Sequence, residues 1–221
     1  MQTATVLDKI SESVGELPPT VVCVDIEATC WESDAPGDLR THEVIEIGMV
    51  AINTQALEIT REISILIQPV ENPVLSDFCV QLTSITNELL VNPGLDDPVA
   101  PYEIVRANAF GQAMQIVREW LAPLGRYVWC SWGNYDLRQM EAEAARKGAE
   151  LALQASLHFN AKMIYAKTRS GVKRRGLGAA VKRQNLSFSG TQHRGVDDAR
   201  NVARVILSDQ CVVFAGSTKD K

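Results

Sequence analysis

The chain has 221 residues, of which 46% are hydrophobic, and its formal net charge is −5. This size and apolar content are enough for the core of one compact domain. The sequence has no stretch of 18 apolar residues and no N-terminal apolar run, so we expect neither a membrane span nor a secretory signal.

The chain contains five cysteines, Cys23, Cys30, Cys79, Cys130 and Cys211. Their odd number and the lack of a C-x-x-C pair argue against a disulfide framework or a zinc cluster. A reducing, cytoplasmic location is therefore expected. Cys23 and Cys130 lie in apolar segments that predict strands, and we expect them to pack in the core.

The predicted elements alternate along most of the chain. The β-branched run at 20–26 follows two prolines and predicts a buried strand. Further strands are predicted at 43–53, 61–68, 127–131 and 161–165, and helices at 75–80, 86–91, 103–122, 135–147, 176–184 and 197–208. The three early strands, expected to be antiparallel, and the later alternation predict an α/β fold with a mixed five-stranded sheet flanked by α-helices. We expect one domain over 18–212 between flexible ends, 1–17 and 213–221.

Two carboxylates interrupt the end of the first strand. Asp25 and Glu27 are two residues apart and therefore face the same side of a strand. Buried like charges need a compensating partner, and oxygen ligands favour Mg²⁺ or Mn²⁺. The alternative is a strand that runs into a solvated loop, where acidic residues are ordinary.

Two more acidic positions occur at predicted helix starts. Asp136 follows the apolar stretch 127–132 and the turn residues Gly133 and Asn134, where the helix macrodipole alone would favour an acidic residue. Asp197 and Asp198 open the helix at 197–208, and only one of them can face a given site because neighbouring helical residues point about 100° apart. The other is expected to be a capping residue. His193 lies five residues before Asp198, and it is a candidate general base.

These segments resemble the DEDDh exonucleases of the RNase H-like fold, a family of 3′–5′ exonucleases. Asp25, Glu27, Asp136, His193 and Asp198 match the family's motif positions one by one. The sequence most resembles the Eri-type exoribonuclease subgroup, through the segments 25–30, 75–79, 82–86, 130–133 and 195–201. The acidic segment 92–101 departs from the subgroup and puts substrate fit in question. The resemblance covers residues 20–207.

The resemblance implies two-metal hydrolysis that releases nucleoside 5′-monophosphates from RNA 3′ ends. Two Mg²⁺ ions, for which Mn²⁺ can substitute, would activate water and stabilise the leaving oxygen. The expected ligands are Asp25, Glu27, Asp136 and Asp198, with Glu27 as the bridge and His193 as the base. The expected partner is single-stranded RNA or an RNA 3′ overhang.

Several further residues are candidates for contacts with the substrate. The resemblance implies that the backbone of Ala28, Thr29 and Cys30 meets the terminal 3′ end, and that Thr83 lies in the terminal-nucleotide pocket. Trp31 and Trp132 could stack on a base, although a core position is more usual. Thr83 could equally be a helix cap.

The positive charges are concentrated late in the chain. Residues 162–204 hold eleven Lys and Arg against Asp197 and Asp198, a balance of +9, whereas residues 1–161 hold nine basic and 23 acidic residues. The densest run is Lys173, Arg174 and Arg175. A basic stripe beside an active site is suited to binding phosphates, although a solvated face is the ordinary explanation of such a run.

Three alternatives stay open on the sequence. The same chemistry could act on DNA, and the fold could serve as a nucleic-acid-binding module without turnover. A glycosidase needs only two carboxylates, so it leaves the other two, the histidine and the basic run unexplained.

Overall fold

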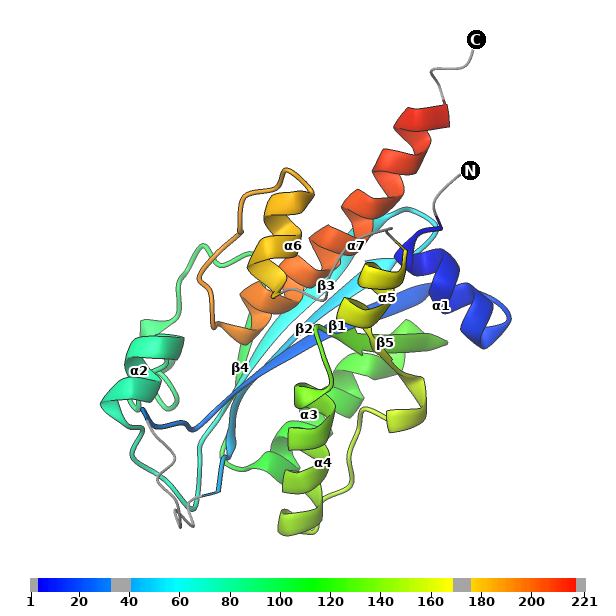
Figure 1. Ribbon diagram of the computed structural model, residues 1–221. Helices are drawn as coiled ribbons and strands as arrows, with labels where there is room; N and C mark the ends of the chain where they lie inside the picture. The colour runs from blue at the N-terminus through cyan, green and yellow to red at the C-terminus, as the bar shows by residue number, and fades with distance from the viewer. Residues whose placement is uncertain (1–3, 33–40, 169–175, 218–221) are drawn as a thin grey trace.

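The computed structural model describes residues 4–32, 41–168 and 176–217, with side chains described as far as residue 209. A mixed sheet of six strands forms its centre, in the order β4-β3-β2-β1-β5-β6 (Figure 1). The strands are β1 Thr20–Ala28, β2 Val44–Asn53, β3 Glu58–Ile67, β4 Glu103–Ala107, β5 Tyr127–Ser131 and β6 His158–Asn160. The pairs β1–β2 and β2–β3 are antiparallel, as expected, and the other three pairs are parallel.

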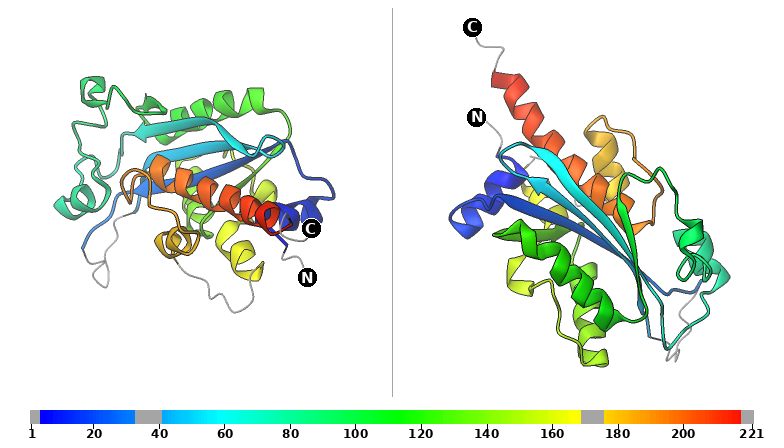
Figure 2. Two further views of the ribbon diagram at one scale, coloured as in Figure 1. Left: turned by 90° about the horizontal axis from the view of Figure 1, so that it is seen from above. Right: turned by 180° about the vertical axis from the view of Figure 1, so that it is seen from behind.

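Helices cover both faces of this sheet. Helices α3 (Phe110–Leu121) and α4 (Tyr135–Lys147) lie on one face, and α1 (Val6–Val14), α5 (Ala161–Lys167), α6 (Leu177–Arg183) and α7 (Gly195–Ser217) lie on the other (Figure 2). Helix α2 (Asp77–Thr83) covers a separate small core at one end of the sheet. The α/β class and the mixed sheet are therefore confirmed. In the part of the chain that the structure describes, no helix has the length and apolar character needed to cross a membrane.

The side chains of β1 divide between these two layers. Val22, Val24 and Ile26 pack in the core under α3 and α4. Val21 and Cys23 pack in the core under α7. Because successive side chains in a strand alternate between faces, Asp25 and Glu27 continue the face that α7 covers.

The expected helix at 103–122 is wrong in its first part, because residues 103–107 form β4 and add the sixth strand. Arg106 on β4 donates hydrogen bonds to the carbonyl oxygens of Leu89 and Asn92 and pairs with the Asp96 carboxylate. Ala109 begins α3 without a side-chain cap, so the sequence carries little sign of the boundary. The same contacts hold the acidic segment 92–101 against β4, and residues 86–91 form turns rather than the expected helix.

The expected strand at 161–165 is also wrong, because it lies within α5. Asn160 caps this helix by accepting a hydrogen bond from the Met163 N–H. The strand in this region is β6, which comprises only the three residues before the helix. An Asn before a run of good helix formers was the available signal.

Within the N-terminal segment that we expected to be flexible, 1–17, residues 6–14 form α1. Thr5 and Asp8 form a capping box, and Val6, Leu7 and Ile10 are buried. The Val6 N–H donates to the Asp209 carboxylate, which attaches α1 to α7. In the tail that we expected to be flexible, 213–221, residues up to Ser217 continue α7, and 218–221 lie outside the described residues.

Helix α7 crosses β1 and β2 at a point of very close approach. A Cβ atom on Gly48 of β2 would lie 2.0 Å from the carbonyl carbon of Gly195, and one on Gly195 would lie 2.9 Å from the Asp25 carbonyl oxygen. The two backbones can approach this closely because both positions are glycine, which has no Cβ atom.

We therefore expect Gly48→Ala to lower the free energy of unfolding by about 3 kcal/mol or more, because the added methyl group meets backbone that cannot move aside. Urea denaturation measures this change. Gly111→Ala is the matched control, since a Cβ there meets nothing within 4 Å and Ala favours the helix. Equal stability of the two variants would contradict the close approach.

Candidate active site

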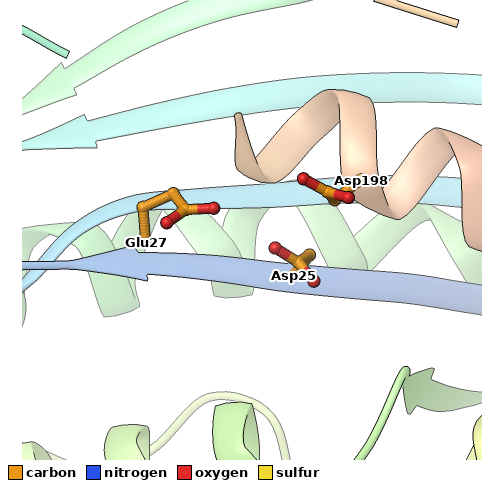
Figure 3. Close-up of side chains that lie close together, drawn as sticks. All are labelled: Asp25, Glu27 and Asp198. Atoms are coloured by element: carbon orange, nitrogen blue, oxygen red, sulfur yellow. The ribbon is translucent and has the colours of Figure 1, made fainter. Parts of the chain in front are cut away.

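Three carboxylates from the first strand and the last helix meet on one face of the sheet. Asp25 and Glu27 project from β1 towards Asp198 in the first turn of α7 (Figure 3). One oxygen from each of the three lies within 4.8 Å of the others. These are hard oxygen donors, which suit Mg²⁺ or Mn²⁺. The structure thus brings together three of the four expected metal ligands.

The fourth expected ligand, Asp136, is buried beside this group. It lies in the first turn of α4, and its Oδ1 accepts a hydrogen bond from the Ile26 N–H at 3.2 Å. Ile26 stands between Asp25 and Glu27, so this bond joins α4 to the acidic end of β1. Asp136 lies outside the tight group of three.

The carboxylates are costly to ionise together. Burial raises the pKa of Glu27 to about 8, and the charges of Glu46 and Asp198 add to the effect. Burial also raises the pKa of Asp25 well above its usual range, with Asp136 as the largest charged contributor. Burial raises the pKa of Asp198 to about 6, against the hydrogen bond from the His193 N–H. A divalent cation is the partner that would remove this repulsion.

His193 is exposed and lies immediately before α7, with a positive φ of 62°. Its backbone N–H donates to Asp198 Oδ2 at 2.7 Å. The loop therefore fixes the main chain of His193 against a candidate metal ligand while the imidazole stays accessible to solvent. This placement is compatible with a general base.

Asp197 was expected to cap the helix, but its side chain bonds to the loop before α7 and to Arg200. Its carboxylate accepts a hydrogen bond from the Thr191 N–H at 2.8 Å and pairs with Arg200. Asp198 alone faces the site, which agrees with the helical spacing of the two residues.

Sequence reasoning missed the pair of residues that anchors α7. Glu46 is fully buried on β2, directly across from Glu27. It accepts hydrogen bonds from the Arg194 side chain at 3.1 Å and from the Gly195 N–H at 2.9 Å. A charged residue inside the apolar run 43–53 was the signal that could have revealed it.

A second missed group surrounds Asp136. The positive charge of Lys162 and a hydrogen bond from Ser131 oppose the rise that burial causes in the pKa of Asp136. Ser131 Oγ also lies 2.9 Å from His158 Nε2, and burial lowers the pKa of His158 to about 4. His158 is therefore neutral near pH 7, and its ring nitrogen contacts Ser131 without adding a positive charge near Asp136.

Most of the expected substrate-binding residues make hydrogen bonds to other parts of the protein. Ala28 and Thr29 are buried, and the Thr29 hydroxyl accepts a hydrogen bond from the Glu43 N–H. The carbonyl oxygen of Cys30 accepts one from Ser76 Oγ at 2.6 Å. Thr83 is fully buried; its hydroxyl donates to the Cys79 carbonyl and accepts from the Ile85 N–H, which makes it a helix-end cap.

The aromatic and basic candidates also need revision. Trp132 packs at 5.6 Å from the Tyr165 ring at the edge of the core, so the core interpretation holds for it. Tyr135, directly before Asp136, is 57% exposed, and it was not among the aromatic residues considered from the sequence. Trp31 lies 5.6 Å from the His42 ring. Lys173, Arg174 and Arg175 lie outside the described residues.

The mixed sheet, its covering helices and the acidic end of β1 together define a nuclease of the RNase H-like fold. A family model described as Exonuclease matches residues 22–206. The chain therefore belongs to this exonuclease family.

Curated relatives agree with this assignment. The 3'-5' exonuclease Snipper of Drosophila melanogaster is 32% identical over 196 residues, which cover 84% of this chain and 67% of that protein. The 3'-5' exoribonuclease 1 of Rattus norvegicus is 29% identical over 216 residues, or 92% and 57% of the two chains. ERI1 exoribonuclease 2 of Xenopus laevis is 27% identical over 91% of this chain and 30% of its own length. The chain thus spans only part of these relatives.

A solved structure supports the same conclusion. The nuclease domain of 3'hExo, a DEDDh family member bound to rAMP, has a TM-score of 0.71 and 25% identity, covering 91% of this chain and 94% of that one. The resemblance to the DEDDh exonucleases and to the Eri-type subgroup is confirmed.

Replacing Glu27 by Gln should separate charge repulsion from folding. The pKa of Glu27 rises from its ordinary value of 4.5 to about 8 in the folded protein because the side chain is buried. Between these two pH values the unfolded chain is ionised at Glu27 while the folded protein resists ionisation, so the wild type in EDTA loses stability as the pH rises over this range. Glu27→Gln removes that loss, and we expect a higher Tm than wild type at pH 8 to 9 in EDTA.

The same variant should gain less Tm than wild type when Mg²⁺ or Mn²⁺ is added, because a ligand is missing. Thermal denaturation with and without metal measures both effects. Glu141→Gln, an exposed position on α4, is the control and should change neither. A Glu27→Gln protein that is less stable in EDTA would refute the repulsion.

Proposed function

We propose that this chain is a metal-dependent 3′–5′ exoribonuclease that releases nucleoside 5′-monophosphates from RNA 3′ ends. The observation that carries the proposal is the meeting of Asp25, Glu27 and Asp198 oxygens within 4.8 Å on the face beneath α7. Membership of the exonuclease family and the exoribonuclease names of several relatives support the reaction type. The rAMP bound to the 3'hExo nuclease domain supports a nucleoside monophosphate product.

The donor set fits divalent cations, because three carboxylates converge there and the charge of Asp136 acts on all three of them. When bound, two Mg²⁺ or Mn²⁺ ions would supply charge neutralisation and a more acidic water. In this proposal Asp25, Glu27 and Asp198 would hold the cations. Asp136, buried beside them, would assist in holding the cations.

His193 acts on the attacking water in this mechanism. His193 is exposed, and its backbone N–H is fixed by the 2.7 Å bond to the Asp198 carboxylate. It takes the proton as the water attacks phosphorus, and the bond to the 3′-oxygen of the preceding nucleotide breaks. The negative charge on that oxygen then leaves with the shortened strand.

RNA is the proposed substrate class, single-stranded or as a 3′ overhang. We also propose a reducing, cytoplasmic setting, which the unoxidised thiols of Cys23, Cys79 and Cys130 favour. DNA hydrolysis is the competing outcome of the test below.

Digestion of a 5′-labelled single-stranded RNA in Mg²⁺ or Mn²⁺ tests the proposal. We expect a ladder that shortens from the 3′ end, nucleoside 5′-monophosphates as products, and no cleavage in EDTA. A matched DNA oligomer cleaved faster than the RNA would move the substrate class to DNA. A folded wild-type protein that cleaves neither strand would refute the activity.

Asp198→Asn and His193→Ala should both fold and lose activity. Loss of the base should lower kcat by about 10²–10⁴-fold, with metal binding retained. Asp198→Asn should lose metal-induced thermal stabilisation as well. Asp77→Asn on α2 is a control outside the acidic site. Wild-type turnover by either site variant would contradict its proposed role.

A further inference from the structure

A cavity of about 430 Å³ lies beside the loop that carries His193. It opens between α6 and residues 186–192, and its apolar wall is formed by Val181, Leu186 and Phe188. Two polar side chains, Lys182 and Gln192, and Gly178 also line the cavity. Gln192 directly precedes His193, so one end of the cavity borders the proposed catalytic base.

The cavity wall is held in place from α7. Asn201 Oδ1 accepts the Ser189 N–H at 3.0 Å, and its Nδ2 donates to the Ser189 carbonyl at 2.8 Å. Asp197 accepts the Thr191 N–H at 2.8 Å. Gly190, at φ 80°, lies so close to Asp197 that a Cβ would come within 2.2 Å of its carboxylate carbon. The loop is therefore shaped before any ligand arrives.

The chemistry of the lining fits a nucleotide. Its volume lies within the range of small-molecule sites. Phe188 offers a ring against which a base can stack, and bases stack on aromatic side chains without strong sequence preference. Lys182 is exposed and suits a phosphate, while the Gln192 amide can both donate to and accept from a base edge.

We propose that this cavity binds a nucleotide upstream of the terminal one, on the 5′ side of the bond that is cleaved. The proposal rests on the proposed function and deepens it. The base lies against Leu186 and Phe188, Lys182 contacts its phosphate, and Gln192 contacts the base edge. The strand thus runs from the carboxylates past His193 and onto α6.

Two substrates separate this site from the catalytic centre. The p-nitrophenyl ester of uridine 5′-monophosphate has no upstream nucleotide, whereas a ten-nucleotide RNA fills the cavity. For Lys182→Ala and for Phe188→Ala, we expect the ratio of kcat/KM for the RNA to that for the ester to fall about tenfold, mainly through KM. Phe188→Tyr keeps an aromatic ring and should restore the ratio.

Lys9→Ala is the matched control, because Lys9 is a half-exposed lysine that pairs with Glu12 on α1, and α1 is attached to the far part of α7. It should leave the ratio at the wild-type value. An unchanged ratio in Lys182→Ala and Phe188→Ala, or an equal loss on both substrates, would overturn the proposal.

Binding gives a second readout that needs no turnover. Fluorescence anisotropy of the labelled RNA in Ca²⁺ should show weaker binding by Lys182→Ala, with the slope of log K against log salt reduced by about 0.7. This measurement tests the cavity even if the wild-type protein cleaves neither substrate, which would refute the proposed function instead. Wild-type affinity and slope in Lys182→Ala would overturn the cavity proposal.

Discussion

The contact between Gly48 and Gly195 is the constraint on which the candidate site depends. Asp198 reaches Asp25 and Glu27 only because α7 begins directly on the surface of β1 and β2. A Cβ on either glycine would collide with the opposing backbone. The buried Glu46 carboxylate then fixes the helix start by binding the Gly195 N–H and the Arg194 side chain. Steric access and one buried ion pair together set the position of the acidic group.

Glu46 also adds to the charge problem that it helps to organise. It lies across from Glu27 and raises the pKa of that residue, while Arg194 lowers it. Replacing such a buried ion pair with apolar side chains is often neutral or stabilising in other proteins. Here the pair is best explained by position: it holds the helix terminus, and the remaining negative charge is left for a cation.

The sequence predicted the grouping of the acidic side chains better than the boundaries of the helices and strands. Asp25 and Glu27 share a face because strand alternation is a strict local rule, and Asp198 rather than Asp197 faces the site because helical spacing is equally strict. The start of α3 and the short β4 were missed because Arg106 and its long-range partners decide them. For Thr83 the sequence left open a choice between the nucleotide pocket and a cap, because its local sequence cannot reveal that its hydroxyl is already bonded at both ends.

Glu46 could not be assigned from its neighbours in sequence for the same reason. Its partners, Ser64, Arg194 and Gly195, lie 18 or more residues away. The N-terminal helix is different, since Thr5 and Asp8 form a local capping box that was visible. Misjudging that segment was a failure to weigh a local signal, whereas Glu46 required the tertiary structure.

The first two turns of α7 serve two purposes with adjacent side chains. Asp198 faces the carboxylates of β1, while Asp197 and Asn201 face the loop that forms the cavity wall. His193 lies at the junction, bonded through its backbone to Asp198 and preceded by Gln192 of the cavity. A shift of this helix would therefore move the Asp198 carboxylate, His193 and the cavity wall together. The proposed register between the terminal phosphate and the upstream nucleotide is thus set by one rigid element rather than by separate loops.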